Sequence, residues 1–298
     1  MSAPARAVAP RVFVLGAGRA GKGLARALLA SGVDVVGLHG RRRESSEAPL
    51  AVTAGELPPA LAGAGVVLVA VQDGALDAAL SELLASRRLA PGAVILHASG
   101  SAEAAGPGQA LRDAGHGFGT FHPLVPLSDA ARAPAMLRGA WVGIDGDARA
   151  RDAATALAAA LGAHTIAIPQ GAKARYHAAA VFASNFPVVL AAIAARLMAD
   201  VGVDPEAARG AVERLLALAA ANVAGRDPAA ALTGPVVRGD AVTVRRHLEA
   251  LAGDDEARSV YLALSRAALG ITTLDPAAAR AVRRALDDAT PGRGGSGA

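Results

Sequence analysis

The segment from residue 12 to residue 30, VFVLGAGRAGKGLARALLA, restricts the possible folds more than any other part of the chain. A short apolar run, the pattern of a buried strand, ends at Leu15. Gly16, Gly18 and Gly21 follow in the spacing G-x-G-x-x-G, and a helical pattern comes next. In a dinucleotide-binding unit the first glycine allows the tight turn, the second admits the pyrophosphate and the third lets helix pack on strand. The segment therefore predicts a Rossmann unit, the alternative being a tight turn that binds nothing.

The end of the second expected strand, at Leu38, bears on the choice of cofactor. An NAD site places a carboxylate there for the ribose hydroxyls, but the chain reads HGRRR and has no acid before Glu44. Arg41 and Arg42 suit the 2′-phosphate of NADP(H), because a guanidinium can hold a phosphate with two hydrogen bonds. The alternative is a solvated loop in an arginine-rich protein. The residues predicted to bind NADP(H) are Gly16, Gly18, Arg19, Ala20, Gly21, Arg41, Arg42, Val71, Gln72, Asp73 and Ser99.

Strand-like runs alternate with helical patterns as far as Pro169, which predicts an α/β fold with a doubly wound parallel sheet. Further strands are expected at residues 66–71, 93–97, 117–121, 141–144 and 165–168. Ligands of such sheets bind outside the carboxyl ends of the strands. Gln72-Asp73, Ser99 to Ser101 and His122 follow or end three of these strands, although Ser, Gly and Asp are also common turn residues.

Beyond Pro169 the strand pattern stops and an all-α domain is expected. Helices are predicted at residues 171–199, 205–223, 241–252, 255–269 and 276–288. Pro187 predicts a kink or break in the first of them, and Asp204 and Asp275 are expected to cap the helices that follow. The predicted domains are a Rossmann domain at 1–169, a helical substrate and dimerisation domain at 170–290 and a disordered tail at 291–298.

The start of the helical part, QGAKARYHAAAVFASN at residues 170–185, is unusual in this chain. Of 30 Lys and Arg residues only Lys22 and Lys173 are lysines. At about 100° per residue, Lys173, His177 and Ser184 form one polar stripe, with Asn185 at its margin. Their neighbours are almost all apolar, so the stripe is expected to face either a cleft between the two domains or a buried network. We favour the cleft, where a lysine or histidine could exchange a proton near neutral pH.

Composition excludes several function classes. The chain has no cysteine, which rules out disulfides, thiolate metal sites and a cysteine nucleophile. Its seven histidines show no i, i+4 ligand pair, so no metal site is expected. A net charge of +4 without aromatics among the arginines argues against nucleic-acid binding. No strongly apolar run of about 18 residues and no signal peptide is evident, so a cytoplasmic protein without a membrane span is expected.

The glycine loop, FHPL (121–124), YHAAAVFASN (176–185) and LTGPVVRGDAVTVRRHLEAL (232–251) together resemble a bacterial family of Rossmann-like oxidoreductases with a C-terminal domain of unknown function 2520. The resemblance covers about residues 10–270 and implies an NADP-dependent oxidoreductase. More distantly, the chain is similar to prephenate dehydrogenase, pyrroline-5-carboxylate reductase, ketopantoate reductase and the β-hydroxyacid dehydrogenases, so the helical domain is expected to resemble that of 6-phosphogluconate dehydrogenase relatives. These families imply a homodimer formed through that domain.

The resemblance also implies roles for particular residues. Ser99 or Ser101, His122 and His177 match, in order, the serine turn, His-Pro motif and helix histidine of prephenate dehydrogenases. Lys173 matches the helix lysine of β-hydroxyacid dehydrogenases, but His177 stands where those enzymes have asparagine. The predicted catalytic residues are His122, Lys173, His177, Asn185 and Ser99, and the predicted substrate-binding residues are Ser101, Ser184 and Arg238.

The expected function is hydride transfer between NADP(H) and a small carbonyl or imine compound, such as a keto acid of the ketopantoate kind. A histidine or lysine would supply the proton. A protein of another class, a non-catalytic NADP(H) sensor, is the alternative, although a sensor has no need of a Lys/His pair near the nicotinamide.

Overall fold

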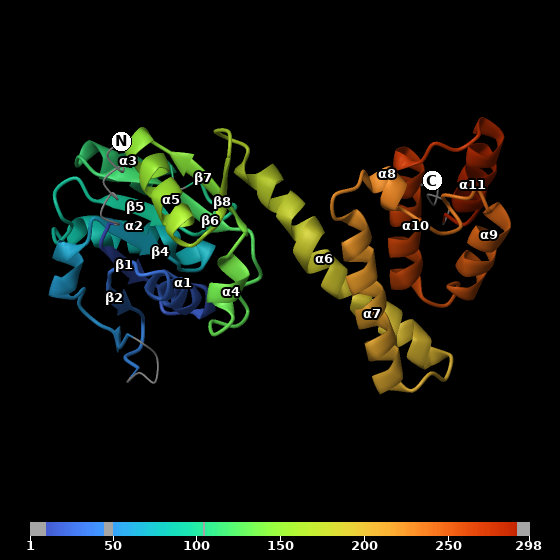
Figure 1. Cartoon of the computed structure of the whole chain (residues 1–298). Helices are drawn as coiled ribbons and strands as arrows, with labels where there is room; N and C mark the ends of the chain where they lie inside the picture. The colour runs from blue at the N-terminus through green and yellow to red at the C-terminus, as the bar shows by residue number, and fades with distance from the viewer. Residues whose placement is uncertain (1–9, 45–49, 104, 291–298) are drawn as a thin grey trace, which may run out of the picture. The chain divides into compact units, whose positions relative to one another are not determined.

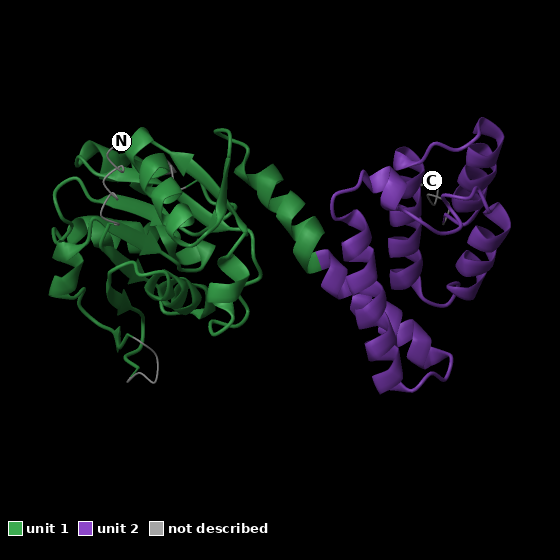
Figure 2. Cartoon of the chain, viewed as in Figure 1, with its two compact units in different colours: residues 1–185 green, residues 186–298 purple. Residues whose placement is uncertain are grey.

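The computed structural model describes residues 10–44, 50–103 and 105–290 (Figure 1). The chain forms two compact units, residues 1–185 and 186–298 (Figure 2). The sequence places the domain boundary at residue 169, whereas the two units divide inside helix α6 (Lys173–Asp200). The first part of α6 therefore belongs with the α/β unit. The expected disordered tail at 291–298 lies outside the described residues.

The first unit is built on an eight-stranded sheet with the order β3-β2-β1-β4-β5-β6-β7-β8. Its strands are β1 (Val12–Leu15), β2 (Val35–His39), β3 (Val52–Thr53), β4 (Val66–Val69), β5 (Val94–His97), β6 (Gly117–Pro123), β7 (Trp141–Gly146) and β8 (His164–Ala167). The neighbouring strands from β3 to β6 all pair in parallel, as expected for a doubly wound fold. The predicted doubly wound sheet is confirmed, with one antiparallel pair that the sequence did not indicate, between β6 and β7.

Two apolar layers cover the sheet, as alternation of side chains along the buried strands requires. Leu68 and Leu96 face helices α1 (Arg19–Ala30), α4 (Ala133–Leu137) and α5 (Ala148–Ala160). Phe13 and Ile95 face α2 (Leu76–Ala85) and α3 (Ala105–Asp113) on the other side. Two short 3₁₀ turns, η1 (Pro59–Gly63) and η2 (Asp73–Ala75), precede β4 and α2.

One row of paired residues crosses the sheet near the carboxyl ends of its strands. Leu15 pairs with Val69, Val69 with His97, His97 with Thr120, and Thr120 with Asp145. The first three of these residues end their strands, but β6 continues for three residues beyond Thr120. β6 therefore extends past the end of β5, and β7 pairs with the extension on the other side.

The second unit is helical throughout the part that the structure describes, as expected. It contains the end of α6, α7 (Pro205–Val223), α8 (Pro228–Ala231), α9 (Ala241–Ala250), α10 (Asp255–Ile271) and α11 (Pro276–Asp288). Val244, Leu262 and Val282 lie in its apolar core, which α9, α10 and α11 form. The predicted caps are confirmed, because the carboxylates of Asp204 and Asp275 each accept two backbone N–H hydrogen bonds at the first turns of α7 and α11.

Helix α6 departs from expectation in two respects. It continues through Pro187 without a break, although the proline nitrogen cannot donate a helical hydrogen bond. In addition, α6 is long enough and apolar enough to cross a membrane by length and composition alone, with a mean hydropathy of 1.9 in its most apolar window. Its valine, leucine, isoleucine, phenylalanine and alanine side chains together give this value, and a single such helix is weak evidence for a membrane.

Candidate functional site

The glycine loop after β1 has the shape that a dinucleotide pyrophosphate needs. Gly16 has a φ of 111°, and a Cβ there would lie 2.2 Å from the carbonyl oxygen of Ala70. A Cβ on Gly21 would lie 1.7 Å from the carbonyl oxygen of Gly16, so this glycine allows helix and strand to pack. Gly18, by contrast, has open space around it. Because α1 begins at the next residue with no acid in its first turn, its free N–H groups suit an anion.

The end of β2 presents cations on the surface of the same unit. Arg41 and Arg42 are both exposed, as a contact with a 2′-phosphate would require. Lys22, in the first turns of α1, pairs with Glu44 at 2.5 Å. The sequence analysis assigned Lys22 no role. Its ion pair occupies the first carboxylate after β2, which could otherwise bind ribose hydroxyls.

A hydrogen-bonded turn follows β5 and holds a carboxylate at the rim of the sheet. The Ser101 hydroxyl donates to Asp73 Oδ2 at 2.6 Å, and Ser99 also hydrogen-bonds to that carboxylate. The Ser99 oxygen accepts the backbone N–H groups of Ser101 and Ala102 at 3.3 and 3.0 Å. Both serines therefore fix the turn and orient Asp73, whose side chain stays exposed.

Two imidazole rings pack over the same turn. The rings of His122 and His177 lie edge to face, with centroids 5.6 Å apart. A Cβ on Gly100 would lie 2.6 Å from both His122 Cε1 and His177 Nδ1, so the glycine makes room for the two rings. The extension of β6 carries His122 to this point, and His122 Nδ1 hydrogen-bonds to the Tyr176 hydroxyl at 3.0 Å. Tyr176 in turn fits only because residue 143 is glycine, where a Cβ would lie 2.2 Å from its oxygen.

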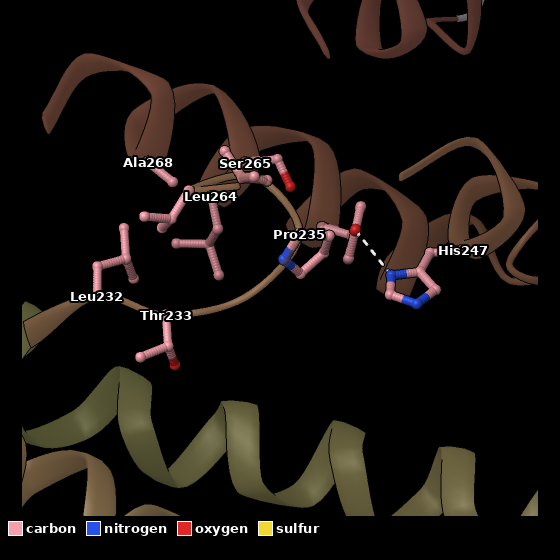
Figure 3. A pocket seen from close by; sticks show the side chains of 10 residues that line it. Leu232, Thr233, Pro235, His247, Leu264, Ser265 and Ala268 are labelled. Atoms are coloured by element: carbon pink, nitrogen blue, oxygen red, sulfur yellow. Dashed lines mark hydrogen bonds between the residues drawn. The ribbon is translucent and has the colours of Figure 1, made fainter. Parts of the chain in front are cut away.

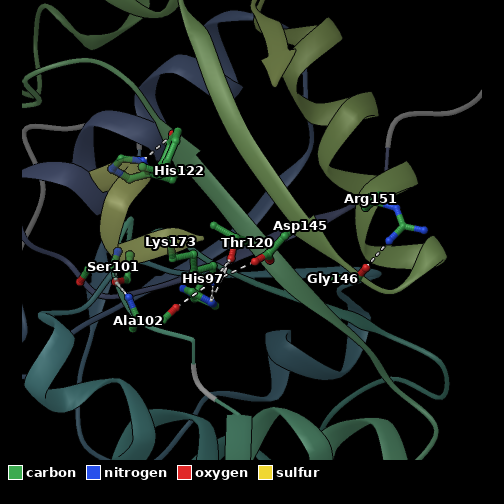
Figure 4. A network of polar contacts seen from close by, with 11 residues as sticks. His97, Ser101, Ala102, Thr120, His122, Asp145, Gly146, Arg151 and Lys173 are labelled. Carbon is green, nitrogen blue, oxygen red and sulfur yellow. Dashed lines mark hydrogen bonds and ion pairs between the residues drawn. The ribbon is translucent and has the colours of Figure 1, made fainter. Parts of the chain in front are cut away.

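Directly beneath the turn, the Lys173 side chain is buried among polar groups from several strands (Figure 4). Its ammonium group lies 3.1 Å from Asp145 Oδ2 and donates to Thr120 Oγ1 at 2.5 Å and to the Ala102 carbonyl at 2.8 Å. It also lies 3.2 Å from His97 Nε2. Of the two environments expected for the polar stripe, Lys173 occupies the buried network. The expected orientation of Lys173 together with His177 into an open cleft is therefore wrong for Lys173, which is only 1% exposed.

Burial and neighbouring charges set the protonation states of this region. Burial lowers the pKa of His97 to about 3, and the Lys173 ammonium acts in the same direction. Burial likewise lowers the pKa of His122 to about 4, helped by His177, and raises the pKa of Tyr176 to about 12. Burial tends to raise the pKa of Asp73, but hydrogen bonds from Ser101 and Ser99 bring it below its usual value. At neutral pH His97, His122 and Tyr176 are therefore uncharged and Asp73 is ionised.

The structure brings together only part of the predicted site. Asp73, Ser99, Ser101, His122 and His177 meet at one turn. The Ser184 hydroxyl instead bonds back to Ala180 of its own helix and to Asn185, both at 2.8 Å, and both side chains are exposed. Sequence reasoning missed His97, Thr120, Asp145 and Tyr176. A histidine ending the apolar run AVILH and an acid following WVGI were the available signals.

Arg238 belongs to the second unit and is exposed, and it does not line the apolar pocket of about 280 Å³ in that unit (Figure 3). The pocket is lined mainly by Leu232, Pro235, Val236, Leu264 and Ala268, with a polar edge at Thr233, His247, Tyr261 and Ser265. His247 Nδ1 and the Tyr261 hydroxyl are 2.9 Å apart. Asp240 caps α9 by accepting the Thr243 N–H at 3.0 Å.

The buried His97 predicts a particular loss of stability in acid. The pKa of His97 is near 3 in the folded chain and 6.5 in the unfolded chain. As the pH falls from 6.5 towards 3, the unfolded chain therefore binds a proton at His97 and the folded chain does not. The stabilisation is therefore complete above pH 6.5 and is lost on acidification. We expect the free energy of unfolding in urea to fall from pH 7 to pH 5 by about 1–2 kcal/mol more in the native chain than in His97→Gln, which cannot titrate.

His164→Gln provides the control for this measurement, since His164 lies exposed at the start of β8. That variant should retain the pH dependence of the native chain. Equal pH dependence in the native chain and His97→Gln would contradict the assignment of His97 as a buried neutral imidazole.

Two family models match the chain. The family described as NADP oxidoreductase, coenzyme F420-dependent, matches residues 11–99, and the domain of unknown function 2520 matches residues 140–268. No match was found among curated proteins.

Solved structures share the fold at low sequence identity. A Bacteroides fragilis protein described as a candidate NADP oxidoreductase is 24% identical, with a TM-score of 0.70 over 87% of this chain and 97% of that one. An imine reductase of Myxococcus stipitatus in complex with NADP⁺ is 18% identical, with a TM-score of 0.59 over 86% and 92% of the two chains. A pyrroline carboxylate reductase of Plasmodium falciparum with NADP bound is 11% identical, with a TM-score of 0.56 over 95% and 97%.

The glycine loop, the sheet and both family matches agree with one another. The first unit is therefore a Rossmann-type domain whose first part matches the NADP oxidoreductase model, and the C-terminal part of the chain matches the domain of unknown function 2520.

Proposed function

We propose that the protein reduces, or forms by oxidation, a small carbonyl or imine compound with NADP(H) as the hydride carrier. The observation that supports this most directly is the cluster at the carboxyl edge of the sheet, where His122, His177 and Asp73 surround one turn. The turn follows β5 and Asp73 follows β4, the strand beside β1 and its glycine loop, and ligands of doubly wound sheets bind outside these strand ends. Bound NADPH would supply a hydride, while the protein holds the substrate and manages its protons.

The cofactor would lie on backbone more than on side chains. The free N–H groups at the start of α1 would hold the pyrophosphate, and Gly18 would allow its close approach. Arg41 and Arg42 would contact the 2′-phosphate. Ser99 and Asp73 were both assigned to the cofactor from sequence, but their hydrogen bonds to each other favour a role in shaping the substrate side of the turn.

The two histidines would contact the reacting group. His122 is uncharged at neutral pH and is held by Tyr176, so its other ring nitrogen can form one hydrogen bond to a carbonyl or imine without adding charge. His177 lies beside His122, in the first turns of α6. Because it is only partly buried, it is the better candidate for exchanging protons with solvent. A protein that only senses NADP(H) would have no use for two imidazoles in contact at this position.

Substitution of these histidines separates catalysis from folding. With an accepted carbonyl or imine substrate, we expect His122→Gln and His177→Gln each to lower kcat by about 100-fold, the usual range for acid–base residues. Both variants should bind NADPH normally, because neither residue belongs to the glycine loop. Lys173→Met should instead lower the free energy of unfolding by about 3–5 kcal/mol, since it leaves Asp145 without its buried cation.

Steady-state kinetics, calorimetric titration with NADPH and urea unfolding distinguish these effects. Near-normal kcat in both histidine variants would refute their catalytic role. If no carbonyl or imine compound in a broad panel is reduced while NADPH still binds, the result would favour a non-catalytic NADP(H) sensor.

The cofactor preference can be tested independently of any substrate. We expect NADPH to bind at least about tenfold more tightly than NADH, a difference of about 1.4 kcal/mol. The double variant Arg41→Ala/Arg42→Ala should lose most of this preference because it removes both guanidinium groups, whereas Arg87→Ala, in the turn after α2, should keep it. Equal affinity of the native protein for the two cofactors in a calorimetric titration would exclude the proposed phosphate contact.

We also propose that the protein is a cytoplasmic homodimer assembled through its helical unit. Several apolar side chains of α6, α7 and the turn between them are at least 45% exposed: Val188, Val189, Val201, Leu215, Leu218 and Val223. A second copy of the chain would cover such a surface. Leu215→Glu should give a monomer in analytical ultracentrifugation, and Val242→Glu, on the exposed face of α9, should not. A native protein that sediments as a monomer would contradict the dimer.

A further inference from the structure

We infer that the site selects a cationic substrate, an iminium ion, and that the Asp73 carboxylate is the residue that recognises its positive charge. This inference rests on the proposed function and narrows its substrate class. The argument combines the position of Asp73, the charges around it and the proton balance of the reaction.

Asp73 is a preorganised carboxylate. It lies four residues after the end of β4, at the start of η2, and the hydroxyls of Ser99 and Ser101 hold it from the neighbouring turn. An ionised carboxylate has about four lone-pair positions, so two hydroxyl donors leave capacity for a further donor. Its side chain is exposed and lies close enough to His177 to interact with it electrostatically. A charged N–H donor held beside the imidazoles could therefore bind to Asp73.

Among the described residues whose charges act on His97 and His122, there is no exposed lysine or arginine that could pair with Asp73. The charges that influence His97 and His122 come from Asp73, Asp145, Lys173 and the imidazoles themselves. Lys173 is buried and paired with Asp145 at 3.1 Å, so it cannot act as an anion clamp. Within this cluster the exposed charge is therefore that of Asp73, which is negative. A keto acid would bring its carboxylate next to Asp73, an unfavourable contact between like charges.

The protons that the reaction requires also favour an iminium ion over a carbonyl. Reduction of a carbonyl leaves an alkoxide that must be protonated as it forms, yet Tyr176 and His122 are poor acids at neutral pH, so His177 alone of the three would have to supply the proton. An iminium ion arrives already protonated. Its carbon accepts a hydride with two electrons from NADPH, the π pair of the C=N bond becomes the lone pair on nitrogen, and a neutral amine and NADP⁺ result. The hydride transfer itself needs no acid. The amine afterwards takes a proton from water, and His177 can carry that proton to it.

The decisive comparison uses three substrates with the native protein, Asp73→Asn and the control Asp77→Asn, which removes the exposed acid in the first turn of α2. The substrates are 2-methyl-1-pyrroline, 1-pyrroline-2-carboxylate and ketopantoate. We expect NADPH oxidation to be fastest with 2-methyl-1-pyrroline and to decline as the pH rises above the pKa of that imine. Asp73→Asn should lower kcat/KM for it at least about tenfold, the scale of one charge-assisted hydrogen bond, whereas Asp77→Asn should change it less than about twofold.

A binding measurement tests the recognition without turnover. Pyrrolidine, the cationic amine product analogue, should bind to the NADPH-loaded native protein and to Asp77→Asn in a calorimetric titration, and at least about tenfold more weakly to Asp73→Asn. Faster reduction of ketopantoate than of 2-methyl-1-pyrroline, or equal pyrrolidine affinity in all three proteins, would overturn the inference while leaving the proposed reductase intact. Absence of NADPH oxidation with every compound, together with normal pyrrolidine binding, would instead count against the proposed function.

Discussion

The contact between the Lys173 ammonium and the sheet is the interaction on which the candidate site depends. It joins the first residue of α6 to β5, β6 and β7 through His97, Thr120 and Asp145. His97 lies in the segment matched by the NADP oxidoreductase model, whereas Asp145 and Lys173 lie in the segment matched by the domain of unknown function 2520. One buried cation thus connects the two matched regions within a single unit. It also sets the position of His177, one helical turn further along α6.

The same network explains why this arginine-rich chain uses lysine at position 173. Partners surround the Nζ atom on several sides at 2.5 to 3.2 Å, an arrangement that suits a compact ammonium better than a planar guanidinium. From the sequence, the rarity of lysine indicated a function for Lys173, and proton exchange was the expected reason. The rarity was informative, but the chemical reason is geometric. His97 and Thr120 are 76 and 53 residues away in sequence, and no local pattern reveals that they converge on one atom.

Features that depend only on residues close together in the sequence were predicted correctly. The turn, the open approach and the close packing assigned to Gly16, Gly18 and Gly21 all appear in the structure, because each follows from the backbone at that residue. The caps at Asp204 and Asp275 follow equally from sequence neighbours. The reversal of β7 could not be predicted this way, because the pattern of apolar residues in a buried strand is the same in either direction. Asp145 reaches the row of paired residues only through that pairing with β6, so its role was hidden as well.

The glycine at position 100 has a consequence for how the site meets a ligand. Since its missing side chain allows both imidazoles to rest on the backbone, and Tyr176 holds one of them, these rings are already immobilised in the folded protein. Ordering a side chain on association typically costs about 0.5–1.5 kcal/mol. That entropic loss is incurred here during folding, so even a small, weakly interacting molecule can retain most of the affinity that its few contacts provide.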